Sequence, residues 1–136
     1  MTRFLLDTNV ISELVRARPN AALLEWMGGS AEADYISVLT IGEVRKGERK
    51  LAMRDPARAD RFAAWIGEVE MQYGARILDV DAAVAHRWGE LSAAGRTLPI
   101  VDALIAATAL AHDLTLVTRN VADFDGTGVK TVNPFG

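Results

Sequence analysis

Four acidic residues stand at the ends of expected elements, where a folded chain could use them for chemistry. Asp7 ends an apolar run, Glu43 and Asp123 each follow another, and Asp102 opens an apolar helical pattern. Carboxylates that crowd together repel one another, so their pKa values rise unless cations neutralise them. Mg²⁺ prefers oxygen ligands and typically takes one or two carboxylates together with waters and substrate phosphate. The four acids therefore predict a site for a divalent metal ion.

Each acid also has a purely structural explanation. Asp7 precedes a helical pattern and could cap that helix. Thr40 and Glu43 have the spacing of a capping box, in which a threonine at the N-cap is reciprocated by a glutamate three residues later. Asp102 and Asp123 could be first-turn acids that the helix dipole favours. One acid alone does not decide between these roles, and it is the coincidence of four that favours a site.

The elements that must position the acids follow from the alternation of short apolar runs with longer helical patterns. Such alternation is typical of a parallel sheet covered by helices on both faces. In open α/β sheets, ligands bind beyond the carboxyl ends of the strands, which is where several of the acids fall. We expect five strands, at residues 4–7, 35–38, 77–80, 115–118 and 129–132.

Capping residues predict where the longer helices begin and end. Asp55 and Pro56 read as an N-cap and first helical residue of a helix that ends at Gly74. Asp81 is expected to cap the next helix. A break at residues 95–99 separates that helix from another over residues 100–112. No repeat or linker divides the chain, so we expect one α/β domain.

Composition narrows the chemistry further. The 136 residues carry a formal charge of −3, half of them are hydrophobic and none is cysteine. Disulfides, iron–sulfur clusters and thiol nucleophiles are therefore excluded. The longest nearly uncharged apolar stretch, residues 98–111, is short of the roughly 20 residues that span a bilayer. The N-terminal apolar run is too short for a signal peptide, so we expect a cytoplasmic protein.

Basic residues are concentrated in one segment. Residues 45–61 hold seven of the fifteen lysines and arginines against three acids. This segment is either a solvated helix face or a patch that steers phosphate groups. The candidates for steering RNA are Arg45, Lys46, Arg49 and Lys50.

Other polar and aromatic residues have weaker claims on the site. Both histidines, His86 and His112, lie in or end helical patterns, so a mechanism with histidine as general acid and base is not expected. Arg119 lies beside the acids in sequence and could contact a phosphate or pair with an acid. The three tryptophans fit the core, with base stacking as the alternative.

The chain resembles PIN-domain ribonucleases, specifically the VapC-type toxins of bacterial toxin–antitoxin pairs, and is similar to their FitB-like members. The resemblance covers essentially the whole chain, and its pieces agree in order and spacing. They are LDTNVISE at 6–13, GEV at 42–44, VDALIAATA at 101–109, LVTRN at 116–120 followed by Asp123 and Phe124, and VNPF at 132–135.

The resemblance implies a single PIN domain over residues 1–136 with a three-layer α/β/α fold and a mainly parallel sheet of about five strands. It also implies an endoribonuclease that depends on Mg²⁺ or Mn²⁺. Asp7, Glu43, Asp102 and Asp123 would form its catalytic, metal-binding cluster, with Asp7 and Asp102 as direct ligands. Five further residues would orient these ligands or touch the RNA, namely Thr8, Asn9, Ser12, Thr118 and Asn120.

The same resemblance implies partners. A toxin needs a cognate antitoxin, usually a small protein with a DNA-binding part and a tail that wraps the toxin, and PIN toxins of this type usually form homodimers in the bacterial cytoplasm. A groove between the early helices would take the tail. Its apolar residues, for which the core is an equal claimant, would be Leu14, Val15, Leu23, Leu24, Trp26 and Met27.

Two other functions are compatible with parts of the sequence. A receiver-like signalling module would use Asp79 or Asp81 as phosphoacceptor and Thr118 near its fourth strand, but it needs a second acid after the first strand and a lysine that closes the fifth. Here Lys130 falls at the start of the last strand. A PIN-like binding domain without activity is the other possibility, although a cluster of acids would repel phosphate.

Overall fold

The computed structural model describes residues 2–29, 34–95 and 97–136. Five parallel strands form one sheet in the order β3-β2-β1-β4-β5. They are β1 (Phe4–Leu6), β2 (Asp34–Ser37), β3 (Ile77–Leu78), β4 (Thr115–Val117) and β5 (Thr131–Val132). The five expected strands are therefore present, each one or two residues shorter than, or offset from, its predicted range.

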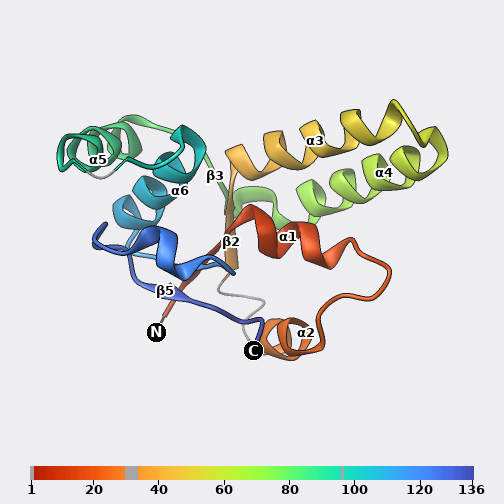
Figure 1. The fold of residues 1–136 in the computed structure, drawn as a ribbon, viewed down its shortest axis with the longest axis horizontal. Coiled ribbons are helices and arrows are strands. Elements are labelled where there is room, and N and C mark those ends of the chain that lie inside the picture. Colours follow the sequence, from red (N-terminus) through yellow and green to blue (C-terminus); the bar gives the residue numbers. More distant parts are fainter. Residues whose placement is uncertain (1, 30–33, 96) are drawn as a thin grey trace.

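Within the described residues, six α-helices and two short 3-10 helices connect the strands (Figure 1). The helices α1 to α4 lie on one face of the sheet and α5 and α6 on the other, which gives three layers. Their bounds are α1 (Thr8–Leu14), α2 (Ala21–Gly28), α3 (Val38–Ala52), α4 (Pro56–Tyr73), α5 (Ala82–Ala93) and α6 (Ile100–Ala111), with η2 (Gly74–Arg76) before β3 and η3 (Val121–Phe124) after β4.

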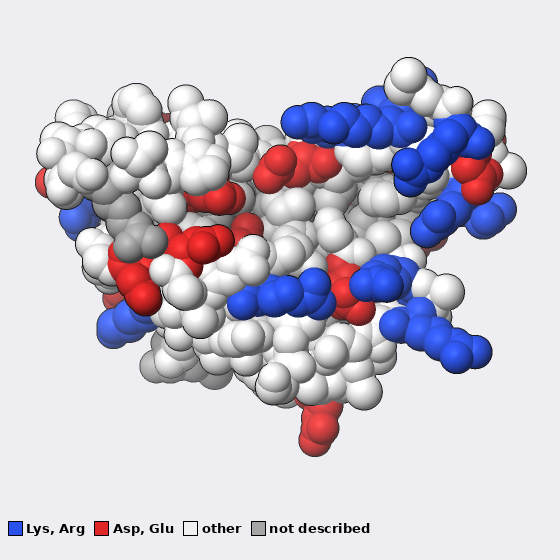
Figure 2. Space-filling model, viewed as in Figure 1, with Lys and Arg blue, Asp and Glu red and all other residues white. Residues whose placement is uncertain are grey.

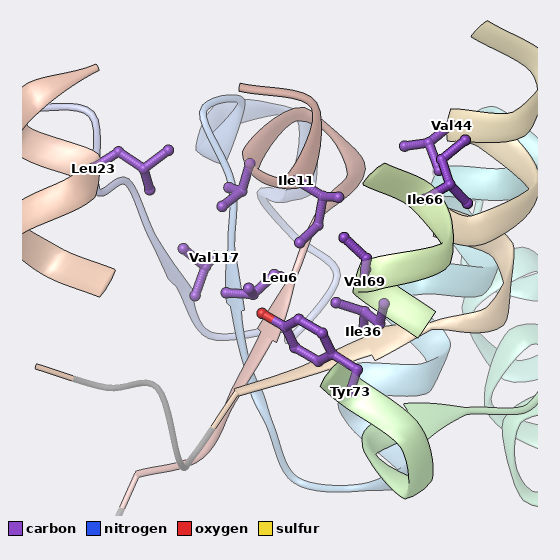
Figure 3. Close-up of a cluster of buried hydrophobic side chains, with 10 residues drawn as sticks. Leu6, Ile11, Leu23, Ile36, Val44, Ile66, Val69, Tyr73 and Val117 are labelled. Atoms are coloured by element: carbon purple, nitrogen blue, oxygen red, sulfur yellow. The ribbon is translucent and has the colours of Figure 1, made fainter. Parts of the chain in front are cut away.

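Neighbouring residues of β1 point into different cores, because side chains alternate across a strand. Leu6 packs with helices α1 to α4 in a cluster that includes Ile11, Ile66 and Tyr73, as Figure 3 shows. Leu5 packs on the other face with Leu116 and the small residues of α6. The central strand is thus buried on both sides, as expected for a parallel sheet.

Most of the predicted caps are present. The Asp55 side chain accepts a hydrogen bond from the Arg58 N–H at 3.2 Å, Pro56 begins α4, and Gly74 follows its last residue with a φ of +48°. Asp81 caps α5 by accepting from the Val84 N–H at 3.0 Å. The predicted break between α5 and α6 is also observed, with position 96 outside the described residues.

The predicted capping box of Thr40 and Glu43 does not form. The helix α3 begins at Val38, and its N-cap is Ser37, whose hydroxyl accepts from the Leu39 N–H at 3.0 Å. The buried Thr40 hydroxyl instead lies 3.1 Å from the hydroxyl of Thr8. Glu43 therefore lies in the second turn of α3, where it does not reciprocate a cap.

Within the described ranges, no helix is both long enough and apolar enough to cross a membrane.

Candidate active site

Asp7 is fixed at the carboxyl end of the central strand by hydrogen bonds to both of its carboxylate oxygens. Oδ1 accepts from the Thr8 N–H at 2.8 Å, so Asp7 also caps α1. Oδ2 accepts from the Thr118 hydroxyl at 2.8 Å and from the Asn9 amide at 3.4 Å. Asp7 can therefore cap α1 and still take part in a functional site, the two roles that the sequence left as alternatives.

Thr118 and Asn9 belong to two segments that meet beneath Asp7. The Thr118 side chain is fully buried at the end of β4, and its oxygen also accepts from the Asn9 amide and the Asn120 N–H, both at 3.1 Å. This arrangement follows from the register of the sheet, which pairs Leu6 of β1 with Val117 of β4. The residues after two adjacent parallel strands thus meet at one edge.

A cavity of about 390 Å³ opens above Asp7 at this edge of the sheet. All four predicted acids line it, from the end of β1, from α3, from the first turn of α6 and from η3. Of the five other predicted residues, four line it; Thr118 does not, but it contacts Asp7, which does. The full lining consists of Asp7, Thr8, Asn9, Ser12, Glu43, Asp102, Asn120, Asp123 and Phe124.

The carboxylates that line the cavity are negatively charged and repel one another. Burial raises the pKa of Asp7, the hydrogen bonds from Thr118 and Thr8 lower it, and the charges of Asp102 and Glu43 raise it further. The pKa of Asp102 is raised by burial first and by the charge of Asp123 second. Among the described residues, no ion pair includes Asp7, Glu43 or Asp102.

This donor set fits a hard divalent cation. The groups are carboxylate, hydroxyl and amide oxygens, and a cation would offset both the burial and the repulsion that raise the two pKa values. In the part of the chain that the structure describes, no group of three or more His, Asp or Glu side chains could hold a metal ion by itself. Mg²⁺ requires no such group, because it usually keeps several waters beside one or two carboxylates.

The four basic residues predicted to steer RNA lie on α3 and do not line the acidic cavity. Two of them pair with the buried Glu48, Arg45 at 2.8 Å and Arg49 at 3.4 Å. Lys46 and Lys50 are exposed. Figure 2 shows basic side chains over the far ends of α3 and α4, with acidic side chains gathered on the other half of the same face.

A second hollow, of about 580 Å³, lies between the end of α1 and the helices α3 and α4. We call it the α1–α4 groove. Its apolar residues are Leu14, Val15, Ala17, Leu51, Phe62 and Trp65, and its basic residues are Arg16, Arg54, Arg58 and Arg61.

The predicted groove between the early helices is only partly observed. Leu14 and Val15 line the α1–α4 groove, but its other wall is built by α3 and α4, not by α2. In α2, Leu23 is buried in the core and Trp26 packs against Phe4 with ring centroids 4.9 Å apart. The remaining predicted residues, Leu24 and Met27, do not line the groove either.

The phosphoacceptors of the signalling alternative and the two histidines lie outside the acidic cavity. The two candidate phosphoacceptors, Asp79 and Asp81, are exposed and do not line the acidic cavity. Neither His86 nor His112 lines it.

Sequence reasoning missed one contact beside the site and left a second open. The missed contact joins the hydroxyls of Thr8 and Thr40. The second joins Arg119 to Glu13, so Arg119 pairs with an acid, which was one of its two expected roles. The spacing of Asn9 and Glu13 could have suggested the second, because residues four apart share a helix face.

Comparisons with known proteins agree with this geometry. The PIN domain family model matches residues 4–128. The VapC ribonuclease Y4jK of Sinorhizobium fredii is 35% identical, and the match covers 96% of each chain. Toxin FitB of Neisseria gonorrhoeae is 31% identical over 96% of this chain and 97% of the relative. The crystal structure of FitAcB from Neisseria gonorrhoeae superimposes with a TM-score of 0.88 at 31% identity, covering 97% of this chain and 98% of the other.

Proposed function

The chain belongs to the PIN-domain family, among relatives named VapC ribonuclease and toxin FitB, and we propose that it is a toxin endoribonuclease that depends on Mg²⁺ or Mn²⁺. The observation that carries the proposal is the cavity at the carboxyl ends of the parallel strands, which four carboxylates line. The raised pKa values of Asp7 and Asp102 support it, because a bound cation would favour the charged forms that burial and the neighbouring carboxylates disfavour.

Asp7 and Asp102 are the proposed direct metal ligands, and Glu43 and Asp123 complete the cluster. When bound, the metal ion would activate a water for attack on phosphorus and stabilise the leaving oxygen. Thr118 and the Thr8 N–H hold the Asp7 carboxylate in place, so its oxygens need not reorganise. Ser12 and Asn120 line the same cavity and are proposed to orient ligands or contact RNA.

Lys46 and Lys50 are the stronger candidates for steering RNA, because Arg45 and Arg49 form ion pairs with Glu48 that partly neutralise their charge. Exposed lysines that attract phosphate act over a distance and lose their effect as salt is added. We place this activity in the bacterial cytoplasm, where RNA substrates are found.

The α1–α4 groove is the proposed docking site for the tail of a cognate antitoxin. Its apolar floor and four arginines match an amphipathic segment with acidic flanks. Glu43 lines the acidic cavity and Gly47 lines the groove, so about 6 Å along α3 separates them. A bound tail would thus lie next to the active site. Reversing the charge of Arg58 and Arg61 should weaken protection by a co-expressed antitoxin without changing cleavage.

A homodimer is also proposed from the family. Analytical ultracentrifugation of the purified chain tests it directly, because a monomer at micromolar concentration would contradict it.

The decisive experiment is cleavage of a mixed small-RNA pool in Mn²⁺ or Mg²⁺, with EDTA as one control. Asp102→Asn keeps the size of the side chain and should abolish cleavage. Asp79→Asn is the matched control, because Asp79 is exposed and outside the cavity. Attack by water predicts products with 5′-phosphate and 3′-hydroxyl ends. Cleavage that survives EDTA, or products with 2′,3′-cyclic phosphate, would refute the metal mechanism.

A further inference from the structure

Glu13 is a buried acid at the end of α1, one helical turn beyond the active site. Only 6% of its surface is exposed. Its Oε2 accepts from the Asn20 N–H at 2.9 Å, and its Oε1 lies 3.4 Å from an Arg16 nitrogen and 3.3 Å from an Arg119 nitrogen. Burial would raise the pKa of Glu13, but the Asn20 N–H and the two arginines outweigh it and lower the pKa. Glu13 is therefore a fixed negative charge.

Arg119 contacts four residues although its side chain is 47% exposed. Its guanidinium reaches Glu13, and its Cζ lies 4.0 Å from the centroid of the Phe135 ring. Its backbone N–H donates to Asn9 Oδ1 at 3.2 Å, and its carbonyl accepts from the Asn133 amide at 3.5 Å. An arginine with a carboxylate and an aromatic face on the same guanidinium has little freedom to move.

These contacts lead directly to Asp7. Arg119 follows Thr118, whose hydroxyl donates to Asp7 Oδ2. The backbone N–H of Arg119 donates to Asn9, and the Asn9 amide donates to the same Asp7 oxygen. Asn9 and Glu13 lie four residues apart on one face of α1. Two connections therefore join α1 to the segment after β4, one at the active site and one a helical turn away.

We propose that Glu13 and Arg119 are positioning residues, which fix the Thr118 hydroxyl and the Asn9 amide on Asp7 Oδ2 and so set this carboxylate for metal binding. The inference rests on the proposed function. Partners of metal ligands commonly change metal affinity or activity by about 10- to 100-fold when they are removed. Arg119 does not contact Asp7 itself but acts through Thr118 and Asn9, so we expect an effect of about tenfold, at the lower end of that range.

The structure supplies a matched control. Arg16 also pairs with Glu13, at 3.4 Å, but it lies on the same segment of chain, three residues further on, and does not reach the segment after β4. Arg119→Ala and Arg16→Ala each remove one cation from Glu13. Only the first removes the connection between the two segments at Glu13, while the contacts of Asn9 at the active site stay in both variants.

The experiment measures Mn²⁺ binding to each purified full-length variant by isothermal titration calorimetry, with RNA cleavage and thermal unfolding in parallel. We expect Arg119→Ala to bind Mn²⁺ about tenfold more weakly and to lose a similar factor in kcat, with KM for RNA unchanged. Arg16 lines the proposed antitoxin groove and not the acidic cavity, and the assay contains no antitoxin. Arg16→Ala should therefore stay within about twofold of the natural chain in both, since it leaves the contact between Glu13 and Arg119 in place.

Three outcomes would overturn the proposal. Equal Mn²⁺ affinities for the two variants would show that the link does not set the site. A raised KM with unchanged Mn²⁺ affinity would show that Arg119 contacts RNA instead. A natural chain that neither binds Mn²⁺ nor cleaves RNA would refute the proposed function itself, and the two failures are therefore distinguishable.

A second variant covers the case in which Arg119→Ala does not fold. Glu13→Gln keeps the shape of the side chain and an acceptor for Asn20 but removes the charge that holds Arg119. It should weaken Mn²⁺ binding in the same direction. Unchanged affinity in Glu13→Gln, together with unaltered unfolding, would contradict the role of the pair.

Discussion

Replacing Thr118 with valine tests the hydrogen bond that holds Asp7, because it removes the hydroxyl without changing the shape of the side chain. Thr118 is completely buried, and its hydroxyl donates to Asp7 Oδ2 at 2.8 Å. A hydrogen bond to a charged group contributes about 1.5 to 3 kcal/mol. The Asn9 amide and the Asn120 N–H also lose their acceptor. Both are near the surface, so water can replace part of what they lose, and we expect about 2 to 4 kcal/mol in total.

Urea unfolding measures this loss directly, and Thr118→Ser is the control. Serine keeps the hydroxyl and removes a buried methyl group, which costs about 0.5 to 1.5 kcal/mol. We therefore expect valine to be the more destabilising substitution, although it preserves the packing. A larger loss in the serine variant than in the valine variant would refute the reasoning, since packing would then matter more than the hydrogen bond.

The pH dependence gives the same prediction a second readout. The Thr118 hydrogen bond favours the charged form of Asp7 and lowers its pKa, against the larger effect of burial. Its contribution is present above the pKa of Asp7 and is lost as the pH falls through it. The difference in unfolding free energy between the natural chain and Thr118→Val should therefore shrink on acidification. A difference that grows would contradict this assignment.

Three further predictions concern other parts of the molecule. Burial raises the pKa of Tyr73 to about 12; the charge of Asp34 adds to this rise and the charge of Arg76 opposes it. Stability should therefore fall as the pH rises from about 10 to 12, by about 2 to 3 kcal/mol, and Tyr73→Phe should remove that part of the slope in urea unfolding. Because the pKa of Asp102 is raised by burial and by Asp123, its charge destabilises the metal-free fold above the pKa of an unfolded aspartate. Asp102→Asn should thus raise Tm in EDTA at neutral pH, lose this gain in acid, and reduce the rise in Tm that Mn²⁺ produces; a lower Tm in EDTA would contradict the assignment. Ala106, fully buried in α6, leaves no room for a larger side chain, so Ala106→Leu should cost about 1 to 3 kcal/mol in urea unfolding, whereas Ala85→Leu on the exposed side of α5 should cost little.

The sequence predicts most elements of this fold because their ends carry local signals. Asp55 and Pro56 start α4 by themselves, since the aspartate caps the first turn and the proline fixes the first helical φ. The start of α3 is different. Ser37 and Thr40 both carry a hydroxyl that can cap a helix, and only the fold decides between them, because it places Thr40 against Thr8.

The acids of the site were predictable for a related reason. Parallel strands end at one edge, so residues that follow them meet without any knowledge of tertiary contacts. The pairing of Glu13 with Arg119 was not predictable in this way, since 106 positions separate the two residues. Pairs of Glu and Arg on the solvated face of this helix were expected from the sequence, but the burial of Glu48 between Arg45 and Arg49 was not, and it leaves less of the basic segment available for RNA.

The strand order also has a consequence for synthesis of the protein on the ribosome. The central strand β1 is made first, but its neighbour β4 and the hydroxyl of Thr118 follow more than a hundred residues later. Domains generally fold as units, and contacts between distant parts of a chain must wait until both parts have been made. A nascent chain that has released α1 to α4 still lacks Asp102, Thr118 and Asp123. The ribosome therefore cannot expose a complete active site until Asp123 has left the exit tunnel, so nascent chains that stop before this residue should be harmless to the cell that makes them.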